Sequence, residues 1–190
     1  MEYTQEDNLL IQSYFTTAFL VELKNNDFLN SDYFKNMPFK DKFVKESLPT
    51  VGIDNQGTLL MMFYTMLVVP KQLLEKEFPV EFEALNGIVD KLKSNAVSTY
   101  RKDSVKIDFI RHIRNAVAHA RVEFNPNVSV KFSDENNGGE KCEITIPLPN
   151  IGLFLTELQK VFLKYIETLK AKMKKSTPYN TQYSKWRGKY

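Results

Sequence analysis

The sequence contains little cysteine and no long apolar run, and each of these shortages excludes a class of protein. Cys142 is the single cysteine among 190 residues, so the chain forms no internal disulfide and offers no thiolate zinc site. The longest apolar stretch, from Leu59 to Pro70, contains about a dozen residues, which is too few to span a bilayer. The acidic segment from Met1 to Asp7 lacks the basic start of a signal peptide. We therefore expect a cytoplasmic protein without a membrane partner.

Positive charge is concentrated at the C-terminal end of the chain. The net charge of the whole chain is +3, but the segment from Thr168 to Tyr190 contains seven Lys or Arg and no acidic residue. Four aromatic residues lie in the same segment: Tyr179, Tyr183, Trp186 and Tyr190. We predict one helical domain over 1–173 and a basic tail over 174–190. The tail either binds nucleic acid through phosphates and stacked bases or is a solubilising terminus without fixed structure.

Apolar residues recur at helical spacing along most of the chain. Thr4 is suited to cap a first helix, with Asp7 three residues on as an imperfect capping box, and Asp54 or Asn55 can cap the helix after the polar segment. Pro79 opens a later helix, and Pro70 should kink or split the helix before it. The predicted helices cover 5–25, 55–75, 79–92, 105–121 and 150–173. The polar segment 26–52 is expected to be loop with one short helix around 40–46.

Between the last two predicted helices the apolar period changes to two, which is typical of strands. The apolar residues of this pattern are Val122, Phe124, Val128, Val130, Phe132, Cys142, Ile144 and Ile146. The segment from Asp134 to Gly139 separates the two runs and is a strong turn signal. We predict a β-hairpin over about 122–147, and hence a mainly α fold: a helical bundle with a β-hairpin insertion before the last long helix. Cys142 alternates with strand residues, which favours a small buried side chain over a nucleophile.

The helix predicted over 105–121, capped by Asp103 or Ser104, carries both histidines of the chain. Stepping its residues by 100° places the apolar residues Ile110, Ile113, Val117 and Ala120 on one face. The opposite, polar face carries Arg111, His112, Asn115 and His119, and Arg114 lies on the flank. His112 and His119 are seven residues apart, about 10.5 Å along the axis, which is too far for two ligands of one ion. We therefore expect no metal site here.

This polar face holds the groups needed to cleave RNA without a metal. A histidine can take or give a proton near neutral pH, and an arginine neutralises a phosphate and its transition state. Asn115 can hydrogen-bond the ribose or fix the imidazole tautomer. The side chains of Arg114 and His119 diverge by about 140°, so they converge only if the arginine curls over or a second helix supplies a partner. An active site at a symmetric dimer interface is therefore expected. The alternative is a face that is simply solvated.

The segment Arg114-Asn115-Ala116-Val117-Ala118-His119 resembles the R-x4-6-H signature of the HEPN superfamily, including the polar residue after the arginine. The signature stands near the C-terminal end of an amphipathic helix, as in that family. This helix, the following hairpin and the long last helix, about Asp103 to Met173, are similar to the bacterial HEPN proteins grouped around the pEK499 plasmid product. The first half of the chain carries no such resemblance.

The resemblance implies a four-helix up-and-down bundle that dimerises with its motif helices face to face. It also implies a metal-independent endoribonuclease that needs no cofactor and acts in toxin–antitoxin, abortive-infection or CRISPR-linked systems. Arg114 and His119 would be the catalytic pair and Asn115 an accessory residue. The ribose 2′-OH would attack the adjacent phosphate and leave a 2′,3′-cyclic phosphate. RNA is then a partner, and an antitoxin or regulatory protein can be another.

Three further residues of the same helix lie outside the signature: Arg111, His112 and Arg121. We assign them to binding of the RNA backbone. Some HEPN-like domains keep the fold without cleaving, and the alternative function is accordingly a non-catalytic module that binds a nucleotide, RNA or a protein.

Overall fold

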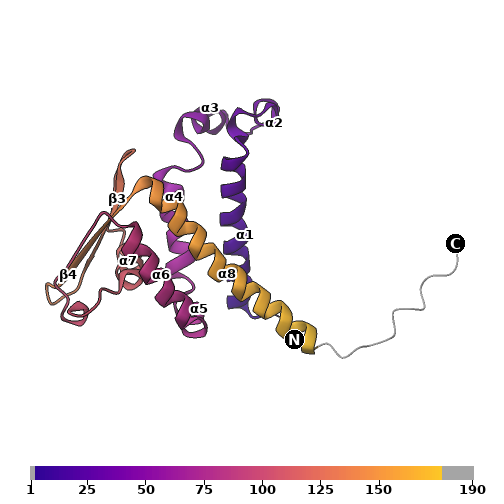
Figure 1. Ribbon diagram of the computed structural model, residues 1–190. Helices are drawn as coiled ribbons and strands as arrows, with labels where there is room; N and C mark the ends of the chain where they lie inside the picture. The colour runs from indigo at the N-terminus through magenta and orange to yellow at the C-terminus, as the bar shows by residue number, and fades with distance from the viewer. Residues whose placement is uncertain (1–2, 177–190) are drawn as a thin grey trace.

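The computed structural model describes residues 3–176, apart from the side chains of 71–73 and 173–176, and is mainly helical with one small sheet (Figure 1). The basic tail over 174–190 lies almost wholly outside these residues. The helices are α1 (Gln5–Asn25), α2 (Asp32–Asn36), α3 (Lys42–Val51), α4 (Gln56–Phe63), α5 (Lys71–Glu77), α6 (Pro79–Leu92), α7 (Phe109–Ala118) and α8 (Leu148–Ser176). The strands are β1 (Asn95–Ser98), β2 (Val122–Asn125), β3 (Ser129–Glu135) and β4 (Lys141–Pro147).

The predicted helix starts are confirmed where a capping side chain or a proline marks them. Thr4 forms a capping box with Asp7 at the start of α1, and the side chain of Asn55 caps α4. Pro79 occupies the first turn of α6. The helix predicted over 55–75 is split before Pro70, as expected: α4 passes into a π-helical segment, η2 (Tyr64–Val68), and α5 begins after the proline.

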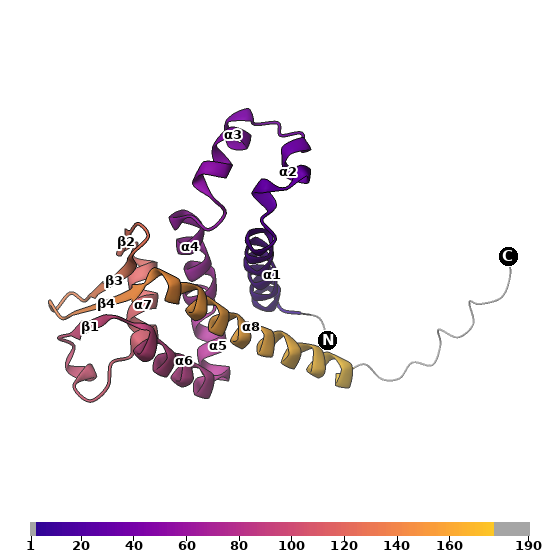
Figure 2. The ribbon, with the colours of Figure 1, turned by 45° about the horizontal axis from the view of Figure 1, so that its top comes forward.

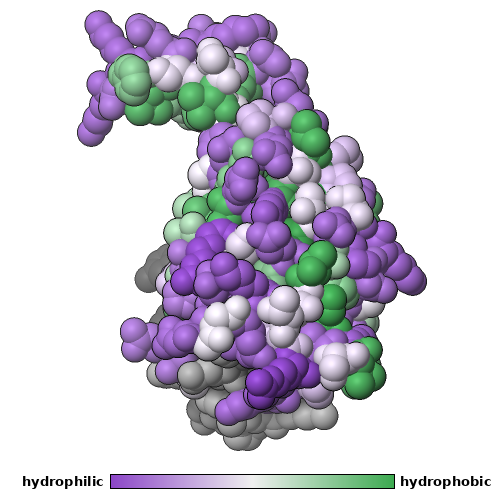
Figure 3. Space-filling view, turned by 90° about the vertical axis from the view of Figure 1, so that its left-hand side faces the viewer, coloured by the Kyte–Doolittle hydropathy of each residue, from purple (hydrophilic) through white to green (hydrophobic). Residues whose placement is uncertain are grey.

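Residues 26–52 contain more helix than predicted. They form a 3-10 turn, η1 (Phe28–Asn30), followed by α2 and α3, and together these elements project from the rest of the molecule as an arm (Figure 2). Ser31 and Asp41 cap the two short helices. The space-filling view shows hydrophobic side chains along the underside of this projecting part (Figure 3). α3 is the short helix predicted around 40–46, and it runs further than predicted, to Val51. The five-residue α2 was missed because so short a helix gives no recognisable apolar pattern in a polar sequence.

The sheet has four antiparallel strands in the order β1-β4-β3-β2, where a single hairpin was predicted. β3 and β4 form the predicted hairpin around the turn at 136–140, and β2 adds to its outer side. The first predicted strand is divided into β2 and β3, which pair with each other. A further strand, β1, was not predicted, and it pairs with β4 at the other edge. Its sequence is Asn-Ala-Val-Ser, and its valine, Val97, is exposed, so the strand carries no alternation with apolar residues on the buried side.

The core lies between the sheet and the helices, and α7 runs through it. Phe63 of α4 contacts Phe132 of β3 and Phe154 of α8, with ring centroids 5.5 and 5.6 Å apart. α7 packs against β3 on one side and against η2 and α6 on others. It is therefore covered on more sides than an amphipathic surface helix. The strict up-and-down order of a four-helix bundle stays a prediction.

α1 and α8 are joined by a polar contact, since the hydroxyl of Tyr165 donates to Asp7.

Over residues 3–176, no helix combines the length and the apolar character that crossing a membrane requires.

Candidate functional site

The helix that carries the HEPN-like segment is shorter than predicted, and its ends are capped differently. α7 begins at Phe109 and ends at Ala118, and its N-cap is Asp108 instead of Asp103 or Ser104. His119 is the C-cap residue, and Ala120 adopts a left-handed backbone conformation with φ of 53°. His119 therefore stands at the exposed end of the helix and outside its last turn.

His112 is buried, which contradicts the prediction that it lies on a solvent-facing polar surface. Its Nδ1 is 2.7 Å from a carboxylate oxygen of Asp134, and its Nε2 is 2.7 Å from a carboxylate oxygen of Asp103. None of the imidazole is exposed. The prediction was wrong because β3 packs against the side of α7 that the helical pattern predicted to face solvent. Because each ring nitrogen faces a carboxylate, His112 links α7 to β3 and to the 101–103 turn.

Arg111 extends this cluster toward the surface. Its guanidinium is 2.7 Å from Asp103 and 2.9 Å from Nε2 of His112, and it lies over the ring of Tyr100. Burial opposes ionisation of Asp103, but hydrogen bonds from Ser98 and His112 hold the pKa of that carboxyl below its usual value. About a quarter of the Arg111 side chain, 24%, remains exposed.

The buried cluster is better suited to hydrogen bonding than to metal binding. Asp103, His112 and Cys142 offer ligand atoms that all lie within 4.8 Å of one another. However, the guanidinium of Arg111 lies against Nε2 of His112, where it repels a cation. Burial also raises the pKa of the Cys142 thiol to about 12, so the thiolate that a metal needs is disfavoured. The sequence prediction of a buried, unreactive Cys142 agrees with this position.

Asn115 is anchored to the same cluster. Its amide nitrogen donates to Asp134 over 3.1 Å, through the carboxylate oxygen that also faces His112. The side chain is half-buried. Because the nitrogen is directed at Asp134, the amide oxygen is the atom of Asn115 left to accept a hydrogen bond from another group.

Arg114 points to a different part of the molecule. Its Nη1 is 2.6 Å from a carboxylate oxygen of Glu75 in α5, and only 7% of its side chain is exposed. Its Nε is buried and has no hydrogen-bond partner among the described residues. Asn115 thus faces β3, whereas the neighbouring Arg114 faces α5.

The remaining predicted residues lie at the exposed end of α7. His119 and Arg121 are both exposed, and Arg121 donates from Nη1 to the backbone oxygen of Glu135 over 2.8 Å. Within the described part of one chain, no hydrogen bond or ion pair joins Arg114 to His119. The structure brings together Arg111, His112 and Asn115, and it leaves Arg114 and His119 apart.

Three acidic residues that contact the candidate residues were not found from the sequence. Asp134 had a usable signal, because it continues the inward period of Val130 and Phe132 along β3, although it was assigned to the turn. Asp103 was considered only as a helix cap. Glu75 gives no local signal, since its contact with Arg114 spans 39 residues.

A basic hollow lies beside the exposed side of Arg111. It has a volume of about 450 Å³ and is lined by Tyr100, Arg101, Lys102, Arg111, Asn136, Gly138 and Glu140. Its charged residues are three cations, Arg101, Lys102 and Arg111, and one carboxylate, Glu140, so the hollow favours an anionic ligand.

Comparison of the sequence with protein families identifies the family of this chain. The model of the family HEPN pEK499 p136 matches residues 1–169, so the chain belongs to that family. Membership indicates a nuclease or a nucleotide-binding module. Comparison with curated proteins and with solved structures gives no match.

Proposed function

We propose that this protein is a metal-independent endoribonuclease whose catalytic residues are Arg114 and His119, assisted by Asn115. The observation that carries the proposal is how the fold positions Asn115 and His119 relative to each other. Asn115 is held by the buried carboxylate of Asp134, and His119 is left exposed one turn further on, at the end of the same helix. RNA cleavage requires a side chain held in a fixed position, here Asn115, close to an imidazole that the substrate can reach, here His119.

In the proposed reaction, His119 removes the proton from a ribose 2′-OH, and the resulting oxygen attacks the adjacent phosphorus. The bond from phosphorus to the 5′-oxygen breaks, that oxygen takes up the proton from the imidazolium of His119, and a 2′,3′-cyclic phosphate remains. Asn115 accepts a hydrogen bond from the ribose through its amide oxygen. The guanidinium of Arg114, once released from its ion pair with Glu75, neutralises the charge that develops on the phosphoryl oxygens.

The site is completed by a second copy of the chain. Arg114 and His119 are five residues apart, about 7.5 Å along a helix, and Arg114 is turned toward Glu75. Two α7 helices related by a twofold axis would bring the arginine of one chain near the histidine of the other. The homodimer is therefore part of the proposal.

RNA binding is assigned to the exposed cations around α7. Arg111 and Arg121 keep the backbone-binding role that the sequence predicted, and the hollow beside Arg111 adds Arg101 and Lys102. His112 does not keep the backbone-binding role that was predicted for it, because a fully buried side chain cannot contact an RNA backbone. His112 instead holds Asp134 in position, and through Asp134 it holds Asn115. In the cell, such an enzyme would act in the cytoplasm as a toxin or phage-defence effector, with an antitoxin or regulatory protein to restrain it.

The test is cleavage of a labelled single-stranded RNA in excess EDTA, with the product ends analysed. Wild type should leave cyclic phosphate ends, and Arg114→Ala and His119→Ala should each lose activity by about 100-fold or more. Lys35→Ala on the projecting arm is the matched control, because its side chain is exposed and far along the chain from α7. Equal cleavage by all four proteins would assign the activity to a contaminant and reject the proposal.

The second candidate is a HEPN-like module that binds a nucleotide, RNA or a protein without cleaving. The observation in its favour is the ion pair between Arg114 and Glu75, which occupies the guanidinium that catalysis needs. Under this alternative, wild-type protein would bind labelled RNA or nucleotide with affinity that falls on Arg101→Ala or Arg111→Ala, and no RNA would be cut.

A further inference from the structure

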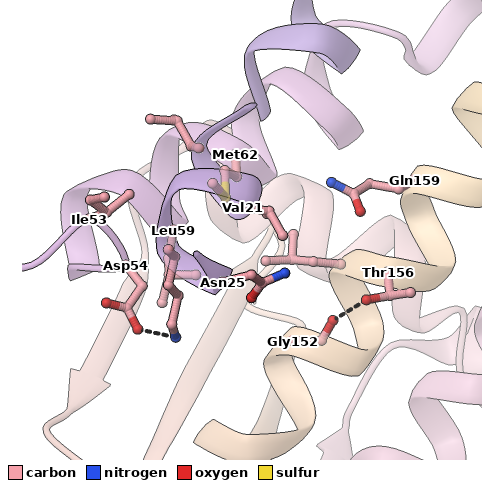
Figure 4. Close-up of a pocket in the computed structure, with 12 residues that line it drawn as sticks. Val21, Asn25, Ile53, Asp54, Leu59, Met62, Gly152, Thr156 and Gln159 are labelled. Carbon is pink, nitrogen blue, oxygen red and sulfur yellow. Dashed lines mark hydrogen bonds and ion pairs between the residues drawn. The ribbon is translucent and has the colours of Figure 1, made fainter. Parts of the chain in front are cut away.

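A second site is indicated by a cavity that contains no residue of α7. It lies where the end of α1, the start of α4 and the first turns of α8 meet, and its volume is about 260 Å³ (Figure 4). Its walls are mostly apolar and are formed by Leu20, Val21, Ile53, Leu59, Met62 and Leu155. Apolar walls with few polar groups are typical of small-molecule sites.

Besides the exposed Asn25 and Thr156, the cavity has polar groups of two kinds. At the rim, Lys24 forms an ion pair with Asp54, which joins α1 to the loop before α4. The hydrogen bond from Lys24 holds the pKa of Asp54 below its usual value, so both groups stay charged and satisfied by each other. A charged ligand would therefore have to break this pair, whereas a neutral ligand would not.

The second kind is the side-chain amide of Gln159. It reaches from α8 toward Val21 and Met62 (Figure 4), and its Nε2 is buried without a hydrogen-bond partner among the described residues. The nearby hydroxyl of Thr156 donates to its own helix, at the backbone oxygen of Gly152, and so does not serve Gln159. A buried amide donor needs an acceptor.

The size of the cavity limits what can occupy it. An apolar cavity of about 150 Å³ accommodates benzene, and 260 Å³ leaves additional room for a short substituent. At Gly152 the wall is open, since a Cβ built there would meet no atom within 4 Å. A single ring with a short polar arm therefore fits without displacing the surrounding helices.

We propose that this cavity binds a small neutral molecule with an apolar body of about one ring and a single carbonyl or hydroxyl acceptor, which receives the hydrogen bond from Gln159. The site is independent of the proposed RNase site. Met62 forms part of its wall, and the next residue, Phe63, packs on Phe132 and Phe154 in the core. Occupancy therefore stabilises the contact between α4 and α8.

The proposal is tested with two probes of nearly the same shape, acetophenone and ethylbenzene, of which only the first carries an acceptor. Binding to the full chain is measured by ligand-observed NMR titration. Acetophenone should bind the wild type with a dissociation constant of roughly millimolar or tighter. It should bind about two- to tenfold tighter than ethylbenzene, which is the ratio that one hydrogen bond supplies.

Two variants separate the features of the site. Gln159→Leu should abolish the preference for acetophenone while leaving ethylbenzene binding intact. Gly152→Leu adds a side chain at an exposed residue that lines the cavity, and should weaken both probes by about tenfold or more. Gly87→Leu in α6 is the matched control, because a Cβ there also meets nothing within 4 Å but Gly87 does not line the cavity.

Four results would overturn the proposal. They are the absence of saturable binding to the wild type, an unchanged preference in Gln159→Leu, full binding by Gly152→Leu, and a change of oligomeric state in Gly152→Leu. The last would show that a second copy of the chain covers the cavity. The RNA cleavage assay does not enter any of these measurements, so the two proposals succeed or fail separately.

Discussion

Replacing Asp134 by alanine should destabilise the protein strongly, although this residue lies near a surface turn. Its carboxylate is 4% exposed and accepts hydrogen bonds from His112 and Asn115. Removing it leaves the buried imidazole with a donor that no longer has a partner, and it releases Asn115 from β3. The unfavourable term is the loss of the buried partner of Nδ1, because no other acid lies at that nitrogen of His112 among the described contacts.

The expected size follows from the burial of the pair. Breaking a buried ion pair by removing one partner costs about 3–5 kcal/mol of unfolding free energy. For a chain of this length, each 1 kcal/mol lowers the melting temperature by about 2–4 °C. Asp134→Ala should therefore melt roughly 6–20 °C below the wild type. Asp134→Asn keeps an acceptor but loses the charge, and should cost about 1.5–3 kcal/mol.

Urea unfolding followed by circular dichroism gives the free energies, and thermal melts give the shifts. Asp32→Ala is the control, since its ion pair with Lys35 is exposed and should contribute less than about 1 kcal/mol. If Asp134→Ala unfolds within about 1 kcal/mol of the wild type, the buried pair does not stabilise the fold as argued. If Asp134→Ala is as stable as Asp134→Asn, the acceptor that asparagine retains contributes nothing, and the whole loss comes from the charge.

Three further predictions concern the neighbours of this cluster. Glu75→Gln removes the charge that competes for Arg114, so we expect affinity for an uncleavable 2′-deoxy analogue of the RNA substrate to rise by about a few-fold; an unchanged dissociation constant would show that the ion pair does not restrain Arg114. The pKa of Asp103 is lower in the folded state than its ordinary value of 3.8, so its stabilisation is present above that pH and is lost as the pH falls through the lower folded value. The unfolding free energy should accordingly fall on acidification below about pH 4, and Asp103→Asn should flatten that fall; parallel curves for the two proteins would contradict this. Cys142 is buried, and its pKa is raised to about 12, so it should not react with a thiol reagent at pH 8 until urea unfolds the chain; rapid labelling of the folded protein would contradict its position.

The sequence was a good guide wherever a residue acts on its own backbone neighbours. Thr4, Asn55 and Pro79 mark helix starts because a cap or a proline works within one turn of itself. The β3–β4 turn was found for the same reason. β1 was missed because a strand of four residues at a sheet edge is defined by its partner, β4, and that pairing joins residues about 50 positions apart.

The candidate site was predicted only in part, for a related reason. The residues of the HEPN-like segment were identified, but their environment was not. A helical projection assumes one buried face, and α7 is covered by β3 as well as by other helices. Consequently His112 was placed at the surface, and the acids that face it and Arg114 were not recognised. Such contacts depend on the packing of distant elements, which a pattern within one helix does not contain.

The arm formed by η1, α2 and α3 has its own small set of contacts, which makes it a separate cooperative unit. Phe34 contacts the rings of Phe28 and Phe39, with centroids 5.6 and 5.4 Å apart, and Lys45 donates to two backbone oxygens of the α2 end. Phe43, by contrast, is 75% exposed. Because these contacts stay within the arm, residues 26–52 can open while the core remains folded. Their amide hydrogens should exchange with solvent long before those of β3 and α7, so the chain will show two levels of protection instead of one.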